Sequence, residues 1–242
     1  MDTKISYGKL FLVPTPIAQG PVDLVLPVGT LNVIRNLAFF IVEEERTARR
    51  FLKLVAIDKK IEDLTFFVFN EHSPTTHLSH YLAPAFEGHD IGLLSEAGLP
   101  CVADPGSEIV KQAHVSGIPV VPLTGPSSLM LALMASGFNG QNFTFHGYLP
   151  ADKQSRIRKI KELETIIHEK KQAQLFIEAP YRNIPLFEAL VATCHDNTLL
   201  CIAINLTAGN GTVITKNIRE WKKNPPNIHK IPALFLLYAD FR

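Results

Sequence analysis

The loop at residues 93–108, LLSEAGLPCVADPGSE, follows a short apolar run and combines residues that suit the wall of a binding site. Gly98 and Gly106 allow close backbone approach and unusual dihedral angles, and two prolines stiffen the path of the chain. One interpretation is a cofactor-binding wall at the carboxyl end of a strand. The other is a well-formed turn in which Asp104 helps to cap the helix that begins at Gly106.

A second loop, PLTGPSSLM at residues 122–130, leads into an apolar helix of small residues. Ser127 and Ser128 come at the start of that helix, where N–H groups and hydroxyls can bind a carboxylate or a ribose. The alternative is that Ser127 only caps the helix behind a Gly-Pro turn. Both interpretations stay open at this stage.

At two places, glutamates and an arginine lie close together in the sequence just after a predicted strand, where they could contact a substrate. Glu43 and Glu44 come just before Arg46, and Glu178 comes shortly before Arg182. A carboxylate in such a place can act as a general base, and an arginine can anchor a phosphate. Alternatively, the acidic run stabilises a helix N-terminus through the helix dipole, and Glu178 forms an ordinary surface ion pair with Arg182.

Short apolar runs separated by segments of helical length would position these loops. Runs buried on both faces and alternating with helices are typical of a mainly parallel sheet flanked by helices. Segments 43–55 and 106–117 carry the helical signals. The predicted strands of this first part lie at residues 9–14, 37–42, 64–70, 90–95 and 118–123.

The pattern changes after Leu123, where a second unit begins. It contains a charged amphipathic helix at residues 152–171 and closely spaced strand candidates, which favour a mixed or antiparallel sheet. These candidates begin at residues 142, 173, 197, 211 and 232, and the last one runs to Asp240. We therefore expect two α/β domains, residues 1–121 and 122–242.

The composition narrows the class of protein. Because 24 Lys and Arg balance 23 Asp and Glu, only a local basic patch could attract nucleic acid. Three scattered cysteines without a CxxC pair indicate neither a disulfide framework nor a metal site, which fits a cytoplasmic protein. No apolar run approaches the roughly 20 residues that a membrane span needs, so we expect no membrane partner.

Several common motifs do not occur in the chain. There is no GxxxxGK[ST] of a P-loop, no GxGxxG after the first strand and no GxSxG of a hydrolase. An enzyme with this sequence must bind its cofactor by another arrangement.

The loops described above belong to a collinear series of motifs. The series consists of VPTPI at 13–17, EEER at 43–46, SEAGLPCVADPG at 95–106, GPSS at 125–128, GYLP at 147–150 and IEAPYR at 177–182. Together these motifs resemble the ribosomal RNA small-subunit methyltransferase I family, a branch of the tetrapyrrole-methylase superfamily. The resemblance covers nearly the whole chain, and the SEAGLPCVADPG motif is the most specific part.

The resemblance implies an α/β protein with the two-domain tetrapyrrole-methylase fold and a cofactor cleft between the domains. It implies S-adenosylmethionine as the cofactor, no metal, and a homodimer. Carried over by position, the residues that contact the cofactor are Ile17, Gly98, Leu99, Val102, Ser127, Ser128, Ile177, Leu206 and Pro232.

The resemblance also implies methylation of a ribose hydroxyl in small-subunit ribosomal RNA, so the partner would be ribosomal RNA or the small subunit. Glu43, Glu44 and Glu178 are then the candidate bases, and Arg46 and Arg182 the candidate anchors. This sequence differs from the family motifs mainly on the substrate side. Tyr181, for example, stands where the family motif has a histidine.

Three functions remain open from the sequence. The first is the ribose methyltransferase, for which basic segments within residues 49–53 and 153–164 could contact phosphates. The second is a methyltransferase of the same fold that acts on a tetrapyrrole or another small molecule. The third is a catalytically silent protein that only binds S-adenosylmethionine.

Overall fold

The computed structural model describes residues 7–239, which form two compact units that divide between Ser127 and Ser128. We expected the division after Val121, but the strand at Val120–Pro122 and the loop that follows it belong to the first unit. Asp240, the expected end of the last strand, lies outside the described residues.

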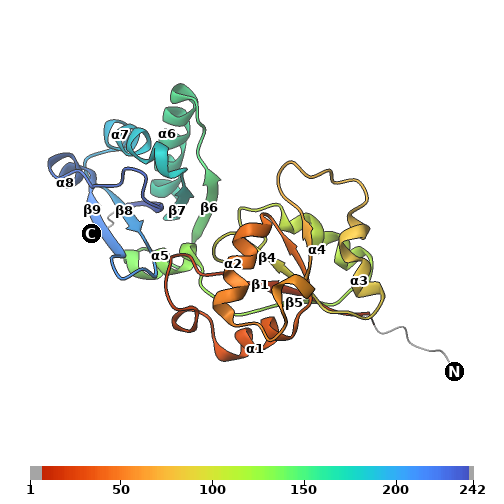
Figure 1. The fold of residues 1–242 in the computed structure, drawn as a ribbon. Helices are drawn as coiled ribbons and strands as arrows, with labels where there is room; N and C mark the ends of the chain where they lie inside the picture. The colour runs from red at the N-terminus through yellow and green to blue at the C-terminus, as the bar shows by residue number, and fades with distance from the viewer. Residues whose placement is uncertain (1–6, 240–242) are drawn as a thin grey trace. The chain divides into compact units, whose positions relative to one another are not determined.

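Five parallel strands form the sheet of the first unit, in the order β3-β2-β4-β1-β5 (Figure 1). The central strands are apolar along their whole length because helices cover both faces of a parallel sheet. The predicted parallel sheet is therefore confirmed. The strands are β1 (Leu10–Val13), β2 (Phe39–Val42), β3 (Thr65–Val68), β4 (Ile91–Leu94) and β5 (Val120–Pro122).

Helices α1 (Val28–Asn36) and α2 (Glu45–Val55) pack on one face of this sheet. Helices α3 (Ala83–Phe86) and α4 (Gly106–Val115) pack on the other face. Neighbouring residues of one strand divide between the two cores, since Phe40 joins the first core and Ile41 the second. Short 3-10 helices lie at Val22–Leu24, Ile61–Asp63 and Leu78–Leu82.

Helix α2 is strongly amphipathic. Its buried face consists of Ala48, Phe51, Leu52 and Val55, which recur at helical spacing and pack on the sheet. The helix ends at Ala56, which adopts a left-handed conformation with φ 55°. The opposite face of α2 is left to solvent.

The second unit contains a mixed sheet in the order β6-β7-β10-β8-β9. Strands β6 and β7 are parallel, and the remaining pairs are antiparallel, which confirms the expected mixed sheet. The strands are β6 (Phe143–Tyr148), β7 (Ala173–Ile177), β8 (Thr198–Ile204), β9 (Thr212–Asn217) and β10 (Ala233–Ala239).

Helices cover both faces of the mixed sheet. The larger core lies under α6, α7 and α8, and the smaller core lies under α5. The helices are α5 (Ser128–Ser136), α6 (Lys153–Lys170), α7 (Asn183–Thr193) and α8 (Ile218–Lys223), and a 3-10 turn lies at Pro180–Arg182. None of the helices between residues 7 and 239 is both long and apolar enough to span a bilayer.

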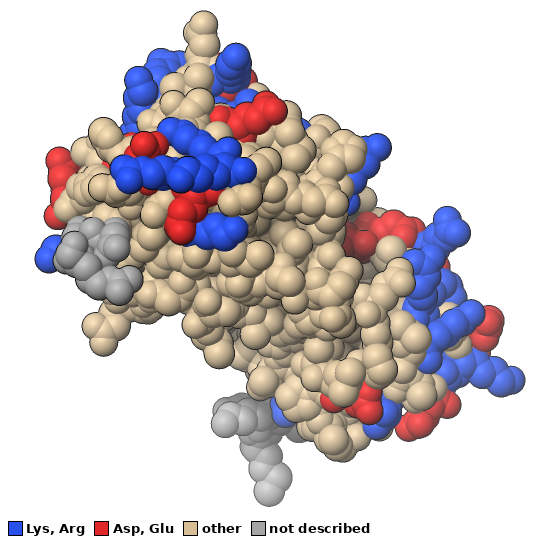
Figure 2. Space-filling view, turned by 90° about the vertical axis from the view of Figure 1, so that its left-hand side faces the viewer, with Lys and Arg blue, Asp and Glu red and all other residues tan. Residues whose placement is uncertain are grey.

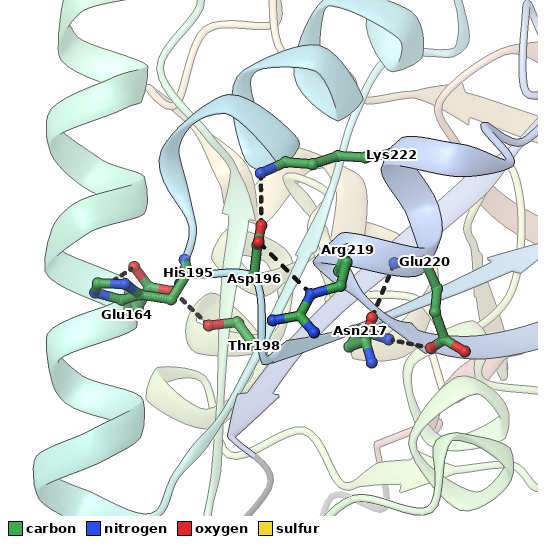
Figure 3. A network of polar contacts seen from close by, with 8 residues as sticks. All are labelled: Glu164, His195, Asp196, Thr198, Asn217, Arg219, Glu220 and Lys222. Carbon is green, nitrogen blue, oxygen red and sulfur yellow. Dashed lines mark hydrogen bonds and ion pairs between the residues drawn. The ribbon is translucent and has the colours of Figure 1, made fainter.

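A polar network joins α6 to the start of β8 (Figure 3). The buried carboxylate of Glu164 accepts hydrogen bonds from the His195 N–H, at 2.8 Å, and from the Thr198 hydroxyl. Asp196, in the same turn, accepts a hydrogen bond from Lys222 of α8 at 2.7 Å. Buried carboxylates are tolerated where such donors satisfy them, so the network fixes the turn before β8.

Helix α8 begins with a capping box (Figure 3). The Asn217 side chain accepts from the Glu220 N–H at 2.8 Å, and the Glu220 carboxylate accepts from the Asn217 N–H at 3.1 Å. We expect Asn217→Ala to lower the free energy of unfolding of the second unit by about 1 kcal/mol. Trp221, the single tryptophan of the chain, is buried in α8, so its fluorescence during urea unfolding measures the change.

Asn217→Ser is the matched control, because serine also caps helices. An unchanged urea midpoint in Asn217→Ala would show that the cap contributes nothing to the stability of this unit.

Candidate functional site

A hollow of about 580 Å³ opens at the carboxyl ends of β1, β2 and β4. Parallel α/β sheets bind ligands at this edge. The loops after the three strands and one side of α2 form the wall. The lining residues are Thr15, Pro16, Ile17, Ala18, Gln19, Gly20, Val42, Glu43, Thr47, Ala48, Arg50, Phe51, Leu54, Leu94, Ser95, Glu96 and Ala97.

Two of these loops are joined by an antiparallel backbone bridge between Thr15 and Gly98. The Thr15 N–H donates to the Gly98 carbonyl at 2.9 Å, and the Gly98 N–H donates to the Thr15 carbonyl at 3.1 Å. The Ser95 hydroxyl donates to the Gly98 carbonyl as well, at 3.0 Å. The first loop and the SEAGLP loop are therefore held as one structure.

Gly98 lies where three predicted cofactor segments meet within the first unit. It has φ 80°, a conformation that L side chains rarely adopt. A Cβ atom built on it would lie 3.5 Å from the Pro126 carbonyl oxygen and 3.8 Å from the side chain of Ile17. The structure thus brings together Ile17, Gly98 and the GPSS segment, which the sequence only suggested by resemblance.

The segment after Gly98 carries backbone strain. Cys101 and Ala103 are not glycines, yet they have φ 67° and 64°. Asp104 holds this turn, because its carboxylate accepts from the Cys101 N–H at 2.9 Å and from the Gly106 N–H at 2.8 Å. Strained backbone that neighbouring contacts enforce is characteristic of functional sites.

Burial affects the titratable groups of this turn. It raises the pKa of Asp104, although the bonds from Gly106 and Cys101 oppose the change. Burial, together with the nearby Asp104 carboxylate, raises the pKa of the Cys101 thiol to about 12. Leu99 is half-buried and Val102 is exposed on the same turn.

The two neighbouring candidate bases have different environments. Glu44 is the N-cap of α2, and its carboxylate accepts from the N–H groups of Arg46 and Thr47, both at 2.9 Å. These bonds lower the pKa of Glu44, so the carboxylate is engaged in holding the helix start. For Glu44, the interpretation as part of a helix N-terminus is therefore the correct one.

Glu43 instead lines the hollow. Its side chain is half-buried, and Oε1 accepts from the Glu96 N–H at 3.3 Å. Burial raises the pKa of Glu43, the carboxylates of Asp104, Glu96 and Glu71 raise it further, and the bond from Glu96 opposes them. A carboxylate with a raised pKa in a hollow is suited to accept a proton near neutral pH.

In the second unit, Glu178 and Arg182 form a close pair at the end of β7. Glu178 is fully buried, and its Oε1 accepts from the Ala179 N–H at 2.7 Å and from the Arg182 Nε at 2.9 Å. Oε2 of Glu178 is buried without a hydrogen-bond partner in the described chain. The pair is thus not the exposed surface ion pair of the alternative interpretation.

The other predicted residues of the second unit also lie near one another. The Asn205 N–H donates to the Pro232 carbonyl at 3.2 Å. This hydrogen bond joins the loop that contains Leu206 to the segment that contains Pro232. Ile177 and Leu206 pack against the same core cluster. Leu206 lies between Asn205 and Thr207, which have φ 48° and 69°, so this loop is strained as well.

Sequence reasoning did not single out Thr47 and Glu96, which also line the hollow, and it named Arg50 only as part of the basic segment at residues 49–53. The Thr47 hydroxyl donates to the Glu96 carboxylate at 2.7 Å and so connects α2 to the loop after β4. The sequence offered one signal for two of these residues, because Thr47 and Arg50 are three residues apart and so lie on the same side of α2. Among residues 7–239, no cluster of three His, Cys, Asp or Glu side chains could hold a metal ion.

Comparison with known proteins finds relatives that share one name. No family model matches the chain. Ribosomal RNA small subunit methyltransferase I of Escherichia coli O157:H7 is 29% identical over 228 residues, which are 93% of this chain and 76% of that protein. The Bacillus subtilis protein of the same name is 34% identical over 196 residues, 81% of this chain and 63% of its own length.

The chain is similar over most of its length to several proteins named ribosomal RNA small subunit methyltransferase I. It spans less than two thirds of several of these relatives, including that of Pseudomonas aeruginosa, of which it covers 59%. The crystal structure of the methyltransferase CobJ matches the fold with a TM-score of 0.64 and 16% identity, over 96% of this chain and 94% of that one. The predicted tetrapyrrole-methylase fold is therefore confirmed, and the protein is a methyltransferase.

Gly125 of the GPSS motif shows how tightly this protein packs its loops. A Cβ atom built on Gly125 would lie 2.3 Å from the Cβ and Cγ atoms of Pro14, in the first loop. We expect Gly125→Ala to destabilise the first unit by about 1–3 kcal/mol, because the proline ring cannot move without shifting the backbone. Differential scanning calorimetry measures the change.

Gly20→Ala is the matched control, because a Cβ on this hollow-lining glycine meets nothing within 4 Å. Its expected effect lies within about 0.5 kcal/mol. Equal melting temperatures for the two variants would contradict the packing argument.

Proposed function

We propose that the protein transfers a methyl group from S-adenosylmethionine to a ribose 2′-hydroxyl of small-subunit ribosomal RNA. The names of its relatives support the RNA substrate. The observation that carries the chemistry is Glu43, a half-buried carboxylate with a raised pKa that lines the hollow at the ligand edge of the first sheet. S-adenosylmethionine, when bound, supplies an activated methyl group.

The residues present fit such a cofactor. The segments of Ile17, Gly98 and Ser127 converge within the first unit, and glycine at position 98 permits this close approach at φ 80°. Leu99 and Val102 add apolar surface on the same turn. From the second unit, we assign Ser128, Ile177, Leu206 and Pro232 to the cofactor on the family resemblance.

We assign the proton transfer to Glu43. A ribose hydroxyl must lose its proton as its oxygen becomes bonded to the methyl carbon, and Glu43 is placed to accept that proton. Glu44 orders the start of α2 and thereby holds Glu43 at the edge of the hollow. Arg46 is exposed beside it and is available for a substrate phosphate.

We assign Arg182 to substrate anchoring and Glu178 to positioning. Two hydrogen bonds from the guanidinium to Oε1 of Glu178 fix the arginine, whose side chain is 24% exposed. A buried carboxylate that holds an arginine restricts its rotamers, which lowers the entropy cost of binding a phosphate. Assembly as a homodimer and a cytoplasmic location belong to the same proposal.

Titration calorimetry with S-adenosylmethionine and S-adenosylhomocysteine is the first test. The second is transfer of labelled methyl groups to purified small ribosomal subunits, followed by mapping of the modified nucleotide. A modified ribose supports the proposal. Transfer only to a small-molecule extract would favour the tetrapyrrole-type alternative, and cofactor binding without any transfer would favour a silent binding protein.

The raised pKa of Glu43 gives the reaction a pH dependence. As pH falls through this raised pKa, the base becomes protonated and kcat falls, so the acidic limb lies at higher pH than for an ordinary carboxylate. We expect Glu43→Gln to lower kcat by about 10²–10⁴-fold and to abolish this limb. Single-turnover methyl transfer from pH 5 to 9 measures both effects.

Glu62→Gln serves as the matched control, since it removes the same charge from an exposed site of the first unit. A Glu43→Gln variant that binds the cofactor and keeps both the rate and the pH profile would exclude Glu43 as the base.

A further inference from the structure

The solvent face of α2 carries a row of cations beside the hollow. Arg46, Arg50 and Lys53 are exposed, and their spacing of four and three residues places them on one side of the helix. A second hollow of about 530 Å³ runs along this side and is lined by Glu44, Glu45, Arg46, Arg49, Arg50 and Lys53. On the face that Figure 2 shows, the lysine and arginine side chains gather in groups, with large uncharged areas between them.

The acidic residues of this row are already engaged. Glu44 is occupied by capping the helix. Glu45 accepts from Nε and NH2 of Arg49, both at 2.7 Å, and Arg49 also lies over the Phe66 ring at 4.7 Å. Arg50 and Lys53 have no acidic partner among residues 7–239. Arg50 and Lys53 therefore present positive charge to solvent without a paired carboxylate.

The other basic segment expected from the sequence, on α6, forms a shorter row, in which Arg158 and Lys161 are exposed three residues apart. Arg156 is buried there, Lys159 pairs with Glu162 at 2.7 Å, and Arg158 donates to the Ser155 hydroxyl. Of the two segments, α2 has the stronger claim to phosphate contacts.

The basic row is continuous with the candidate active site. Arg50 lines both hollows, and Leu54, one helical turn further on, lines the hollow that holds Glu43 and is 59% exposed. A phosphate on Arg50 would therefore leave the attached sugar and base beside a largely apolar wall of Phe51 and Leu54. Unpaired nucleotides are recognised in this way, because their bases are free to enter an apolar site.

We propose that Arg46, Arg50 and Lys53 form a binding surface for the phosphates of single-stranded RNA that directs one nucleotide into the hollow at Glu43. This inference rests on the proposed function and specifies how its substrate is held. Because the whole chain has a formal net charge of only +1, the row on α2 must supply the local attraction that the overall charge does not.

The test uses the full chain and a fluorescently labelled single-stranded oligoribonucleotide, with affinity measured by anisotropy over a series of salt concentrations. Each phosphate contact on a single strand contributes about 0.7 to the slope of log affinity against log salt. We expect Arg50→Gln and Lys53→Gln each to reduce the slope by about this amount, and the double variant by about twice as much. Circular dichroism checks that the variants are folded.

Lys111→Gln is the matched control. It removes one positive charge from an exposed residue of α4, on the opposite face of the same sheet. Its expected salt slope is that of the unmodified protein, and all four variants should bind S-adenosylmethionine as the unmodified protein does.

The surface assignment is wrong if the double variant keeps the original slope, if Lys111→Gln lowers it equally, or if the unmodified protein does not bind the oligoribonucleotide at low salt. Equal competition by an acidic peptide would mark a protein-docking surface and also overturn it. These outcomes are independent of the proposed function, because cofactor binding and methyl transfer to small subunits are measured separately on the unmodified protein.

Discussion

The backbone bridge between Thr15 and Gly98 is the contact on which the candidate site depends. Two N–H to carbonyl hydrogen bonds join the loops after β1 and β4, although these loops are some eighty residues apart in sequence. Because neighbouring parallel strands end at the same sheet edge, the bridge converts two flexible loops into one wall. Gly98 can take part only because it tolerates φ 80°.

Backbone strain occurs on both sides of the division between the units. Cys101 and Ala103 in the first unit, and Asn205 and Thr207 in the second, hold left-handed conformations without being glycines. Each costs of the order of 1 kcal/mol, and such conformations persist only where the surrounding structure over-determines them. Each unit thus holds one such loop in a fixed shape, which is consistent with binding surfaces that are formed before a ligand arrives.

The fold could largely be predicted from the sequence, but the roles of only some of the site residues could. The apolar runs gave the strands, whereas α1 (Val28–Asn36) lay hidden because it follows a proline-rich turn and has Pro27 in place of a polar N-cap. Glu43 and Glu44 are equivalent in a sequence, and only the observed start of α2 at Glu45 shows that the second is a cap. Likewise, the burial of Glu178 and the contribution of Arg50 to the hollow depend on tertiary packing.

The high pKa of Cys101, about 12, has a consequence for chemical self-protection. A thiolate is a far stronger nucleophile than a hydroxyl, so an ionised cysteine next to an activated methyl group would be alkylated in place of the substrate. Burial and the Asp104 carboxylate keep this sulfur protonated at neutral pH. The turn that shapes the wall of the proposed cofactor site therefore also keeps its own thiol in the protonated, weakly nucleophilic form.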